Sequence, residues 1–345
     1  MEKVRIGIVG MGIGRANAQG YVNHPRAEVA ALCDLNAAAM EDYAGELPRR
    51  PSLFTDYKKM CASDEINAVF VGTPNQFHVP VALEAVRNGK HVIVTKPLAD
   101  SLPAARSLVE AAEAAGVVNM MSLSTRFGND VIALGNLAHS GALGDVYYGR
   151  ARSVRRSGIP SWNLGFISQG GGAFRDVGVH VLDSAWWIMG MPQPVSVSGV
   201  AGARFGPHGR GYWDYKPQPE LAKKFDCDDY AGGFVRFANG AGLQVESFWA
   251  SHMREEFQIE ILGDQAGVQS QPPTMYQVIN GTPADTVIHV PKQPSSWVNI
   301  ANHFISSVLD GTPCGAPLRH GLIIQQILEA LLQSASSGRE VAIEL

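Results

Sequence analysis

The chain has 345 residues, of which 46% are hydrophobic and 17% are charged. At roughly 100 to 200 residues per domain, this length predicts about two domains with substantial cores. The ordinary apolar content excludes a disordered chain, and the 37 glycines follow no collagen-like period. The 28 Lys and Arg residues against 32 Asp and Glu residues give a formal charge of -4. No overall positive charge is therefore present to attract nucleic acid or an anionic membrane.

Four cysteines lie far apart in the sequence: Cys33, Cys61, Cys227 and Cys314. Their spacing fits neither a zinc site nor a small domain stabilised by disulfides, so we expect reduced thiols and no bound metal. The first ten residues carry charges at Glu2, Lys3 and Arg5 and match neither a signal peptide nor a membrane anchor. We therefore expect a soluble, cytoplasmic protein that does not contact a membrane.

Residues 1–122 alternate short apolar runs with helix-like stretches, the pattern of a parallel sheet covered by crossover helices. Strands are expected at 4–9, 28–33, 68–71, 91–94 and 117–121. Helices are expected at 15–23, 36–44, 79–88 and 102–115, with Asn36 as the cap of the second helix. This segment is predicted to form the first domain.

From residue 123 to 345 the pattern changes to strands that follow one another, and this segment is predicted to form a second domain. Strands are expected at 145–156, 195–204, 230–237, 242–251 and 257–262, with a hairpin turn at 238–240. The sheet should be mostly antiparallel, and such a sheet can leave one face free for another layer or subunit. Two helices, at 297–309 and 322–334, are expected to close the chain. The segment 206–219 is rich in Gly, Pro and aromatic residues and should be a long loop near a site or interface.

Three glycines follow the first predicted strand and open the first helix: Gly10, Gly12 and Gly14. A dinucleotide pyrophosphate binds close to the backbone of such a loop and accepts hydrogen bonds from the amides of the helix N-terminus. We therefore also predict a cofactor contact at Ile13, between Gly12 and Gly14. The spacing is G-x-G-x-G, one residue tighter than the common form. Asp34 ends the second strand about 20 residues later, where a carboxylate accepts hydrogen bonds from the adenosine ribose. This carboxylate favours NAD, because a 2′-phosphate would meet its charge, although some enzymes of this kind also accept NADP.

Polar residues also follow the third and fourth strands, at the edge where open parallel sheets bind ligands. We predict cofactor contacts from Thr73, Pro74, Asn75, His78, Thr95 and Lys96. His78, taken alone, is better explained as a helix-entry or packing residue than as a catalytic residue. Lys96 lies next to Pro97 at the carboxyl end of a buried strand, so its ammonium could hydrogen-bond a hydroxyl that is being oxidised.

A run of three glycines, 170–172, precedes a predicted helix that carries Asp176 and His180. These two residues are four apart and therefore share one helix face. A carboxylate near an imidazole can fix its tautomer and raise its basicity, which suits a general base acting on a hydroxyl. A helix pair without any role is the alternative, and the combination with Lys96 favours the catalytic interpretation.

Together these motifs resemble the glucose-fructose oxidoreductase, inositol dehydrogenase and rhizopine catabolism family, abbreviated Gfo/Idh/MocA. The resemblance extends along essentially the whole chain and rests on the glycine loop, residues 73–75 with His78, Lys96-Pro97 and the segments 170–180 and 234–240. It implies an α/β plus α+β fold: an N-terminal Rossmann domain with a doubly wound parallel sheet, then a domain with a mostly antiparallel, open-faced sheet. That open face commonly mediates dimer or tetramer assembly. The resemblance also implies that Lys96, Asp176 and His180 occupy the family's catalytic positions.

One residue departs from the family pattern. The usual Glu-Lys-Pro is Thr95-Lys96-Pro97 in this chain. The Glu commonly helps to hold the ribose next to the nicotinamide, so its replacement predicts weaker retention of the cofactor. A threonine hydroxyl could supply a weaker hydrogen bond.

The expected function is that of an NAD-dependent oxidoreductase acting on a secondary alcohol of a sugar, a sugar derivative or a cyclitol. Candidate substrate residues, besides Lys96, Asp176 and His180, are Arg126, Arg155, Arg156, Trp162 and Asn163. Arg155 and Arg156 alternate along a strand, so at most one of them faces the ligand. Trp162 could offer an apolar face to a sugar ring, although a core position is slightly favoured for it. An arginine in the pocket would favour an anionic substrate.

Two other functions use the same residues. A glycoside hydrolase of this family oxidises the sugar transiently with tightly held NAD, eliminates the aglycone and reduces the product, so it needs the same hydride and proton groups. A non-catalytic NAD-binding regulator is the third possibility, but the presence of Lys96, Asp176 and His180 together argues against it. No basic segment supports binding to DNA.

Overall fold

The computed structural model describes residues 2–168 and 170–344. The chain forms two compact units. The first contains the residues up to Phe127 and the segment Gln293–Leu322, and the second contains Gly128–Lys292 and the residues from Ile323 onward. The sequence analysis assigned 293–322 to the second domain, and the structure instead includes this segment in the first unit.

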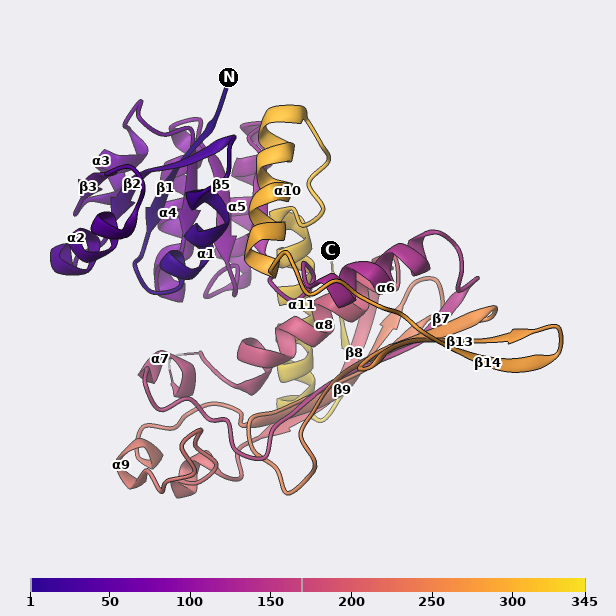
Figure 1. Ribbon diagram of the computed structural model, residues 1–345. Coiled ribbons are helices and arrows are strands. Elements are labelled where there is room, and N and C mark those ends of the chain that lie inside the picture. The colour runs from indigo at the N-terminus through magenta and orange to yellow at the C-terminus, as the bar shows by residue number, and fades with distance from the viewer. Residues whose placement is uncertain (1, 169, 345) are drawn as a thin grey trace. The chain divides into compact units, whose positions relative to one another are not determined.

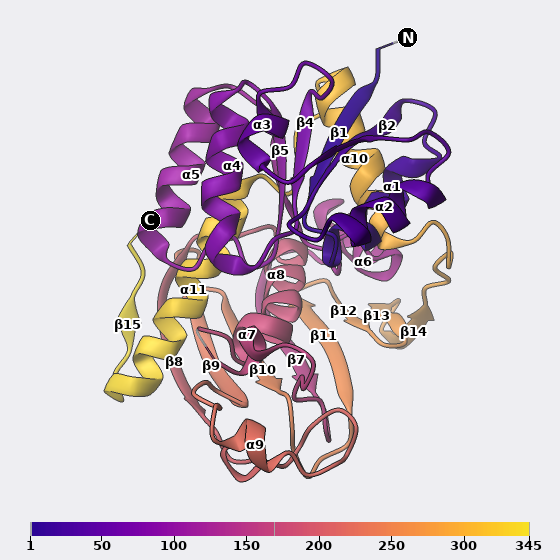
Figure 2. The same cartoon turned by 90° about the vertical axis from the view of Figure 1, so that its left-hand side faces the viewer.

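Helix α10 (Ser296–Asp310) explains this difference, because it packs on helix α1 (Ile13–Val22). The two helices lie side by side in both views (Figures 1 and 2). A Cβ atom at Gly20 of α1 would lie 2.5 Å from Cβ of Ala301, so the backbones approach closely. Such a long-range contact leaves no local signal in the sequence of α10.

The first unit contains a six-stranded parallel sheet in the order β3-β2-β1-β4-β5-β6. This is the order of the Rossmann fold, and it confirms the predicted doubly wound sheet. The strands are β1 (Val4–Val9), β2 (Ala27–Cys33), β3 (Ser52–Phe54), β4 (Ala68–Val71), β5 (His91–Thr95) and β6 (Asn119–Ser122). Only β3 was not predicted, because three residues are too few to show a period.

Three helices that connect these strands lie at nearly the predicted positions: α2 (Ala37–Glu46), α4 (His78–Arg87) and α5 (Leu102–Ala114). The five-residue helix α3 (Tyr57–Cys61) was not predicted. The prediction that Asn36 caps α2 is confirmed, since its side chain accepts a hydrogen bond of 3.1 Å from the N–H of Ala39. Helices α4 and α5 pack side by side (Figure 2). The strands β1, β4 and β5 are buried almost throughout, as expected of a parallel sheet covered on both faces.

The second unit contains a nine-stranded sheet in the order β14-β13-β12-β11-β7-β10-β9-β8-β15. Its strands are β7 (Val146–Val154), β8 (Pro194–Gly202), β9 (Tyr230–Phe237), β10 (Gly242–Phe248), β11 (Glu256–Gly263), β12 (Ala266–Ser270), β13 (Pro273–Ile279), β14 (Thr282–Val287) and β15 (Val341–Ala342). β7 and β10 pair in parallel and the other pairs are antiparallel. The mostly antiparallel sheet is therefore confirmed. The strands from β12 to β15 were not predicted. β14 is almost fully exposed, and β12 and β15 have only five and two residues.

Helices cover one face of this sheet: α6 (Asn129–His139), α8 (Val179–Ile188) and the second half of α11 (Leu318–Ser337). Alternate residues such as Ala151, Ile259 and Ile261 point toward these helices and are buried. The intervening residues of β7 and β11 point to the opposite face, which we call the open face.

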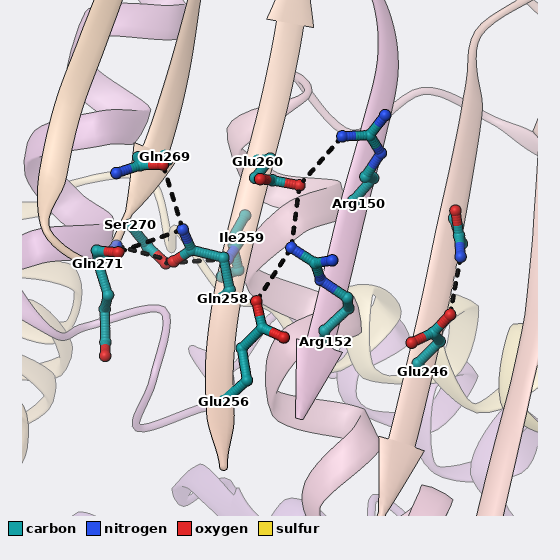
Figure 3. A network of polar contacts seen from close by, with 11 residues as sticks. Arg150, Arg152, Glu246, Glu256, Gln258, Ile259, Glu260, Gln269, Ser270 and Gln271 are labelled. Carbon is teal, nitrogen blue, oxygen red and sulfur yellow. Dashed lines mark hydrogen bonds and ion pairs between the residues drawn. The ribbon is translucent and has the colours of Figure 1, made fainter. Parts of the chain in front are cut away.

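The open face carries a ladder of ion pairs between β7 and β11 (Figure 3). Arg152 lies 3.0 Å from Glu256 and 3.2 Å from Glu260, and Arg150 lies 3.4 Å from Glu260. Opposite charges on neighbouring strands favour this register, each pair contributing roughly 0.2 to 1 kcal/mol. The ladder therefore helps to fix the pairing of the two strands while leaving a polar surface.

Candidate functional site

Each glycine of the loop after β1 has a different surrounding. Gly10 has φ +93°, and a Cβ there would lie 2.4 Å from the carbonyl oxygen of Gly72, so only glycine fits this turn. A Cβ at Gly14 would lie 2.7 Å from Cγ2 of Ile8, so this glycine lets α1 pack on β1. A Cβ at Gly12 would meet no atom within 4 Å. These surroundings match the three roles of glycine in a dinucleotide-binding loop: turn, ligand approach and helix packing.

The N-terminus of α1 has the features of an anion site. Gly12 occupies the cap position and no side chain caps the helix, and the first turn contains no acidic residue. The amides of the first turn are therefore able to donate hydrogen bonds to a pyrophosphate. The positive end of the helix dipole also favours an anion at this position. The residues present fit a dinucleotide at this position.

Asp34 lies directly beside the glycine loop. Its Oδ2 accepts a 2.7 Å hydrogen bond from the N–H of Met11, and its Oδ1 accepts one of 2.9 Å from the N–H of Asn36. Each carboxylate oxygen has a further lone pair, so the group can still accept a ribose hydroxyl. The carboxylate also holds the loop in shape, a role that the spacing in the sequence did not predict.

His78 connects the loops that follow β4 and β5. The ring is fully buried, with Nδ1 2.6 Å from the carbonyl oxygen of Pro97 and Nε2 2.8 Å from that of Thr73. Burial lowers the pKa of His78, and the two carbonyl contacts act in the opposite direction. The sequence predicted a cofactor contact, whereas the structure engages both ring nitrogens with backbone. His78 thus joins the loop of Thr73 to the turn of Lys96-Pro97.

The remaining predicted cofactor residues lie at the start of α1 or at the carboxyl ends of β4 and β5: Ile13, Thr73, Pro74, Asn75, Thr95 and Lys96. Since β1 pairs with β4 and β4 with β5, all in parallel, these ends share one edge of the sheet. Asn75 begins the short 3-10 helix η1 (Asn75–Phe77), and Thr95 is the buried last residue of β5. The peptide bond between Lys96 and Pro97 is cis. The arrangement within this unit supports the prediction of one cofactor edge.

The predicted substrate residue Arg126 is held within the first unit. Its guanidinium donates a 2.8 Å hydrogen bond to the carbonyl oxygen of Gly315 and lies 3.0 Å from Nδ1 of His320, and its side chain is buried. Burial, together with the positive charge of Arg126, lowers the pKa of His320 to about 4. These contacts account for the buried charge inside this unit, and a substrate contact by Arg126 stays a prediction.

In the second unit, Asp176 lies in a widened helical turn. Residues Phe174–Gly178 form a π-helical turn, and the N–H of Val179 bonds to the carbonyl of Phe174. The helix continues as α8 and carries His180. The sequence predicted a regular helix here. Such wide turns are rare and often occur at functional sites, which agrees with the proposed importance of this segment.

Two residues that the sequence analysis missed hold this turn. The indole of Trp249, which is fully buried, donates a 3.0 Å hydrogen bond to Oδ2 of Asp176. Asp228 accepts a 2.9 Å hydrogen bond from the N–H of Phe174, and burial raises the pKa of Asp228 to about 6. Gly172 is required beside it, because a Cβ there would lie 2.1 Å from an Asp228 oxygen. The adjacent acidic pair 228–229 before a strand was the only local signal.

Arg155 and Arg156 follow the end of β7 at Val154, so the prediction that they alternate along a strand is wrong. The guanidinium of Arg155 lies over the ring of Trp213, 5.0 Å from its centroid. Arg156 lines an open pocket of about 630 Å³ together with Tyr215, His252, Met253, Arg254 and Glu255.

The other two predicted substrate residues lie close together in the chain. Trp162 is 66% exposed. Asn163 caps the short helix α7 (Leu164–Ile167), accepting a 2.8 Å hydrogen bond from the N–H of Gly165. Whether these side chains contact substrate stays a prediction.

The described residues contain no group of three or more His, Cys, Asp or Glu side chains arranged to hold a metal ion. Among the helices of the described chain, none combines the length and the apolar character needed to cross a membrane.

Comparison with known families and proteins gives matches over most of the chain. Residues 4–123 match the model of an oxidoreductase family with an NAD-binding Rossmann fold, and residues 111–269 match the GFO/IDH/MocA C-terminal domain. A D-glucoside 3-dehydrogenase of Escherichia coli (strain K12) is 29% identical over 349 residues, covering 98% of this chain and 97% of the relative. An alpha-N-acetylgalactosaminidase of Shewanella oneidensis is 26% identical over 51% of this chain and 39% of the relative. The crystal structure of an oxidoreductase domain protein from Kribbella flavida has the same fold, with a TM-score of 0.86, 23% identity and full coverage of both chains.

Proposed function

Because the chain belongs to the Gfo/Idh/MocA oxidoreductase family, we propose that it is an NAD-dependent dehydrogenase that oxidises a secondary ring hydroxyl of a sugar or cyclitol. The observation that carries this proposal is the full-length similarity to the D-glucoside 3-dehydrogenase, together with a glycine loop shaped for a dinucleotide. A D-glucoside oxidised at its 3-hydroxyl is therefore the first substrate to test. The acid-bearing substrates that an arginine would favour belong in the same panel.

We propose that Lys96, Asp176 and His180 carry out the reaction. Bound NAD would accept the hydride at its nicotinamide ring. His180 takes the proton of the hydroxyl, Lys96 positions the oxygen and stabilises its negative charge, and Asp176 orients them. The hydrogen bond from Trp249 supports this assignment, because it fixes the Asp176 carboxylate at the start of the helix that carries His180. Replacing Lys96 or His180 by Ala should lower turnover about 10²- to 10⁴-fold.

The cofactor is proposed to be NAD. Asp34 supports this choice, since its carboxylate beside the glycine loop would repel a 2′-phosphate. The Thr95 that replaces the family's Glu predicts an exchangeable cofactor. Titration of the protein with NAD and NADP should show tighter binding of NAD, and Asp34→Ala should reduce that difference.

A redox-neutral glycoside hydrolase is the alternative, supported by the similarity to the alpha-N-acetylgalactosaminidase. That match covers half of this chain, whereas the dehydrogenase matches nearly all of it, so the dehydrogenase is favoured. Purified protein with NAD is incubated with D-glucosides, free sugars, cyclitols and nitrophenyl glycosides. Reduced nicotinamide absorbance supports the dehydrogenase, and release of nitrophenol without it supports the hydrolase. Binding of NAD without any turnover would indicate a regulator.

We also propose that copies of the chain associate as a dimer or tetramer through the open face. Besides the charged ladder, this face carries the stacked rings of Tyr230 and Phe248, whose centroids lie 5.7 Å apart. Aromatic residues and arginines, both present on this face, are enriched at subunit interfaces. Sedimentation of the wild type should show an oligomer, and Phe248→Asp should shift it toward the monomer. A monomeric wild type would contradict this proposal.

A further inference from the structure

Two tryptophans of the second unit project into solvent next to each other. Trp162 is 66% exposed and Trp213 is 52% exposed, and their ring centroids lie 6.4 Å apart in an edge-to-face arrangement. Phe166 supports Trp162 from the protein side, with centroids 6.2 Å apart. We call Trp162 and Trp213 the aromatic ledge. Exposed aromatic groups of this size are unfavourable in water and mark a surface that binds something.

The ledge is held rigidly by backbone hydrogen bonds between the two loops that carry it. The carbonyl of Gly211 accepts bonds of 3.0 and 2.9 Å from the N–H groups of Gly158 and Ile159, and Trp213 donates a 3.1 Å bond to the carbonyl of Ile159. The carboxylate of Asp229 also accepts the N–H groups at 204–206, where the second loop begins. A surface fixed in this way loses little conformational entropy when it binds a ligand.

Arg155 connects the ledge to the predicted catalytic carboxylate. Its guanidinium covers one face of the Trp213 ring at 5.0 Å from the centroid. Its N–H donates to the carbonyl of Phe248, and the next residue, Trp249, holds Asp176. Burial lowers the pKa of Arg155, and the negative charge of Asp176 acts in the opposite direction. The Arg155 side chain thus contacts the ledge and also interacts electrostatically with Asp176.

We propose that the aromatic ledge binds the second ring of a glycoside, so that the preferred substrates are disaccharides or aryl glycosides over free monosaccharides. The proposal rests on the proposed function, with the oxidised ring near Asp176 and the next ring on the ledge. The apolar C–H face of a pyranose, or an aryl aglycone, can stack on an indole, and the guanidinium of Arg155 can donate hydrogen bonds to ring hydroxyls.

The test compares kcat/KM for cellobiose and for methyl D-glucoside, with NAD, in the wild type and two variants. Trp213→Ala should lower the ratio of cellobiose to methyl glucoside by about tenfold, the upper range for an aromatic contact. Trp213→Phe should retain most of the ratio, because it still offers a ring. Tyr276→Ala, at an exposed aromatic residue on β13 of the same unit, serves as the matched control and should leave the ratio of cellobiose to methyl glucoside unchanged.

A second measurement does not depend on turnover. Cellobiose should quench the tryptophan fluorescence of the NADH-bound wild type, and this saturable signal should be lost in Trp213→Ala. If sugars are oxidised but the ratio is the same in wild type and Trp213→Ala, the ledge proposal is wrong while the dehydrogenase stands. If no sugar is oxidised, the dehydrogenase proposal fails, and the absence of Trp213-dependent quenching then overturns the ledge as well. A change of oligomeric state in Trp213→Ala with an unchanged ratio would identify the ledge as a protein interface instead.

Discussion

The indole nitrogen of Trp249 lies 3.0 Å from Oδ2 of Asp176, and both residues belong to the second unit. Trp249 is fully buried, so its N–H cannot exchange this partner for water. A hydrogen bond to a charged group contributes about 1.5 to 3 kcal/mol. The bond both orients the carboxylate and favours its ionised form.

We predict that Trp249→Phe lowers kcat and shifts its pH profile, because the Asp176 carboxylate loses a donor and becomes easier to protonate. The acidic limb of the profile should move to higher pH. Trp186→Phe is the matched control: Trp186 is also buried in this unit and donates its indole N–H to the carbonyl of Pro192. Both variants should lose stability, but only Trp249→Phe should move the profile. An identical pH profile of kcat in the two variants would contradict the prediction that this hydrogen bond affects catalysis.

The glycine loop gives a prediction that separates folding from cofactor binding. Gly12→Ala adds a methyl group in open space, so the melting temperature without cofactor should stay near that of the wild type. The same methyl should obstruct the pyrophosphate and weaken NAD binding at least tenfold. Gly14→Ala should instead lower the melting temperature, because its Cβ would lie 2.7 Å from Ile8. Calorimetric titration with NAD and thermal unfolding measure the two effects, and unchanged NAD affinity in Gly12→Ala would contradict the binding role.

The elements predicted best from the sequence are those with a strong local signal. The strand 4–9 was predicted with its exact bounds, and the cap Asn36 was correct, because a buried apolar run and a capping side chain are both encoded within a few residues. The glycine loop and Asp34 could be found for the same reason, since the fingerprint is a fixed spacing around one turn.

The parts that could not be predicted depend on residues far apart in the chain. Trp249 and Asp176 are hydrogen-bonded although they lie 73 residues apart in the sequence, and Asp228 and Phe174 lie 54 residues apart. His78 was recognised as part of the site, but its position between two carbonyls required the coordinates. A periodic pattern reports which face of an element is buried, and it contains no information on which distant side chain becomes its partner.

His320 makes the first unit sensitive to acid. Its folded pKa is about 4 and its ordinary value is 6.5, so folding favours the neutral ring. Its contribution to stability is complete above pH 6.5 and is lost as the pH falls toward about 4, a change of at most about 3 kcal/mol. Chemical unfolding of the wild type and His320→Gln over this range should show a steeper loss in the wild type. Parallel curves would mean that the ring is already accessible to protons in the folded state.

Asp228 should act in the opposite direction in the second unit. Burial raises the pKa of its carboxyl from 3.8 to about 6, so folding favours the protonated form. The stabilising contribution is complete below pH 3.8 and is lost as the pH rises through about 6, again at most about 3 kcal/mol. Asp228→Asn keeps an oxygen that can accept the N–H of Phe174 and cannot ionise. We predict that this variant gains stability relative to the wild type as the pH is raised from 3.8 to above 6, measured by chemical unfolding. A difference between the two proteins that does not change with pH would show that the carboxylate is not titrating in the folded protein.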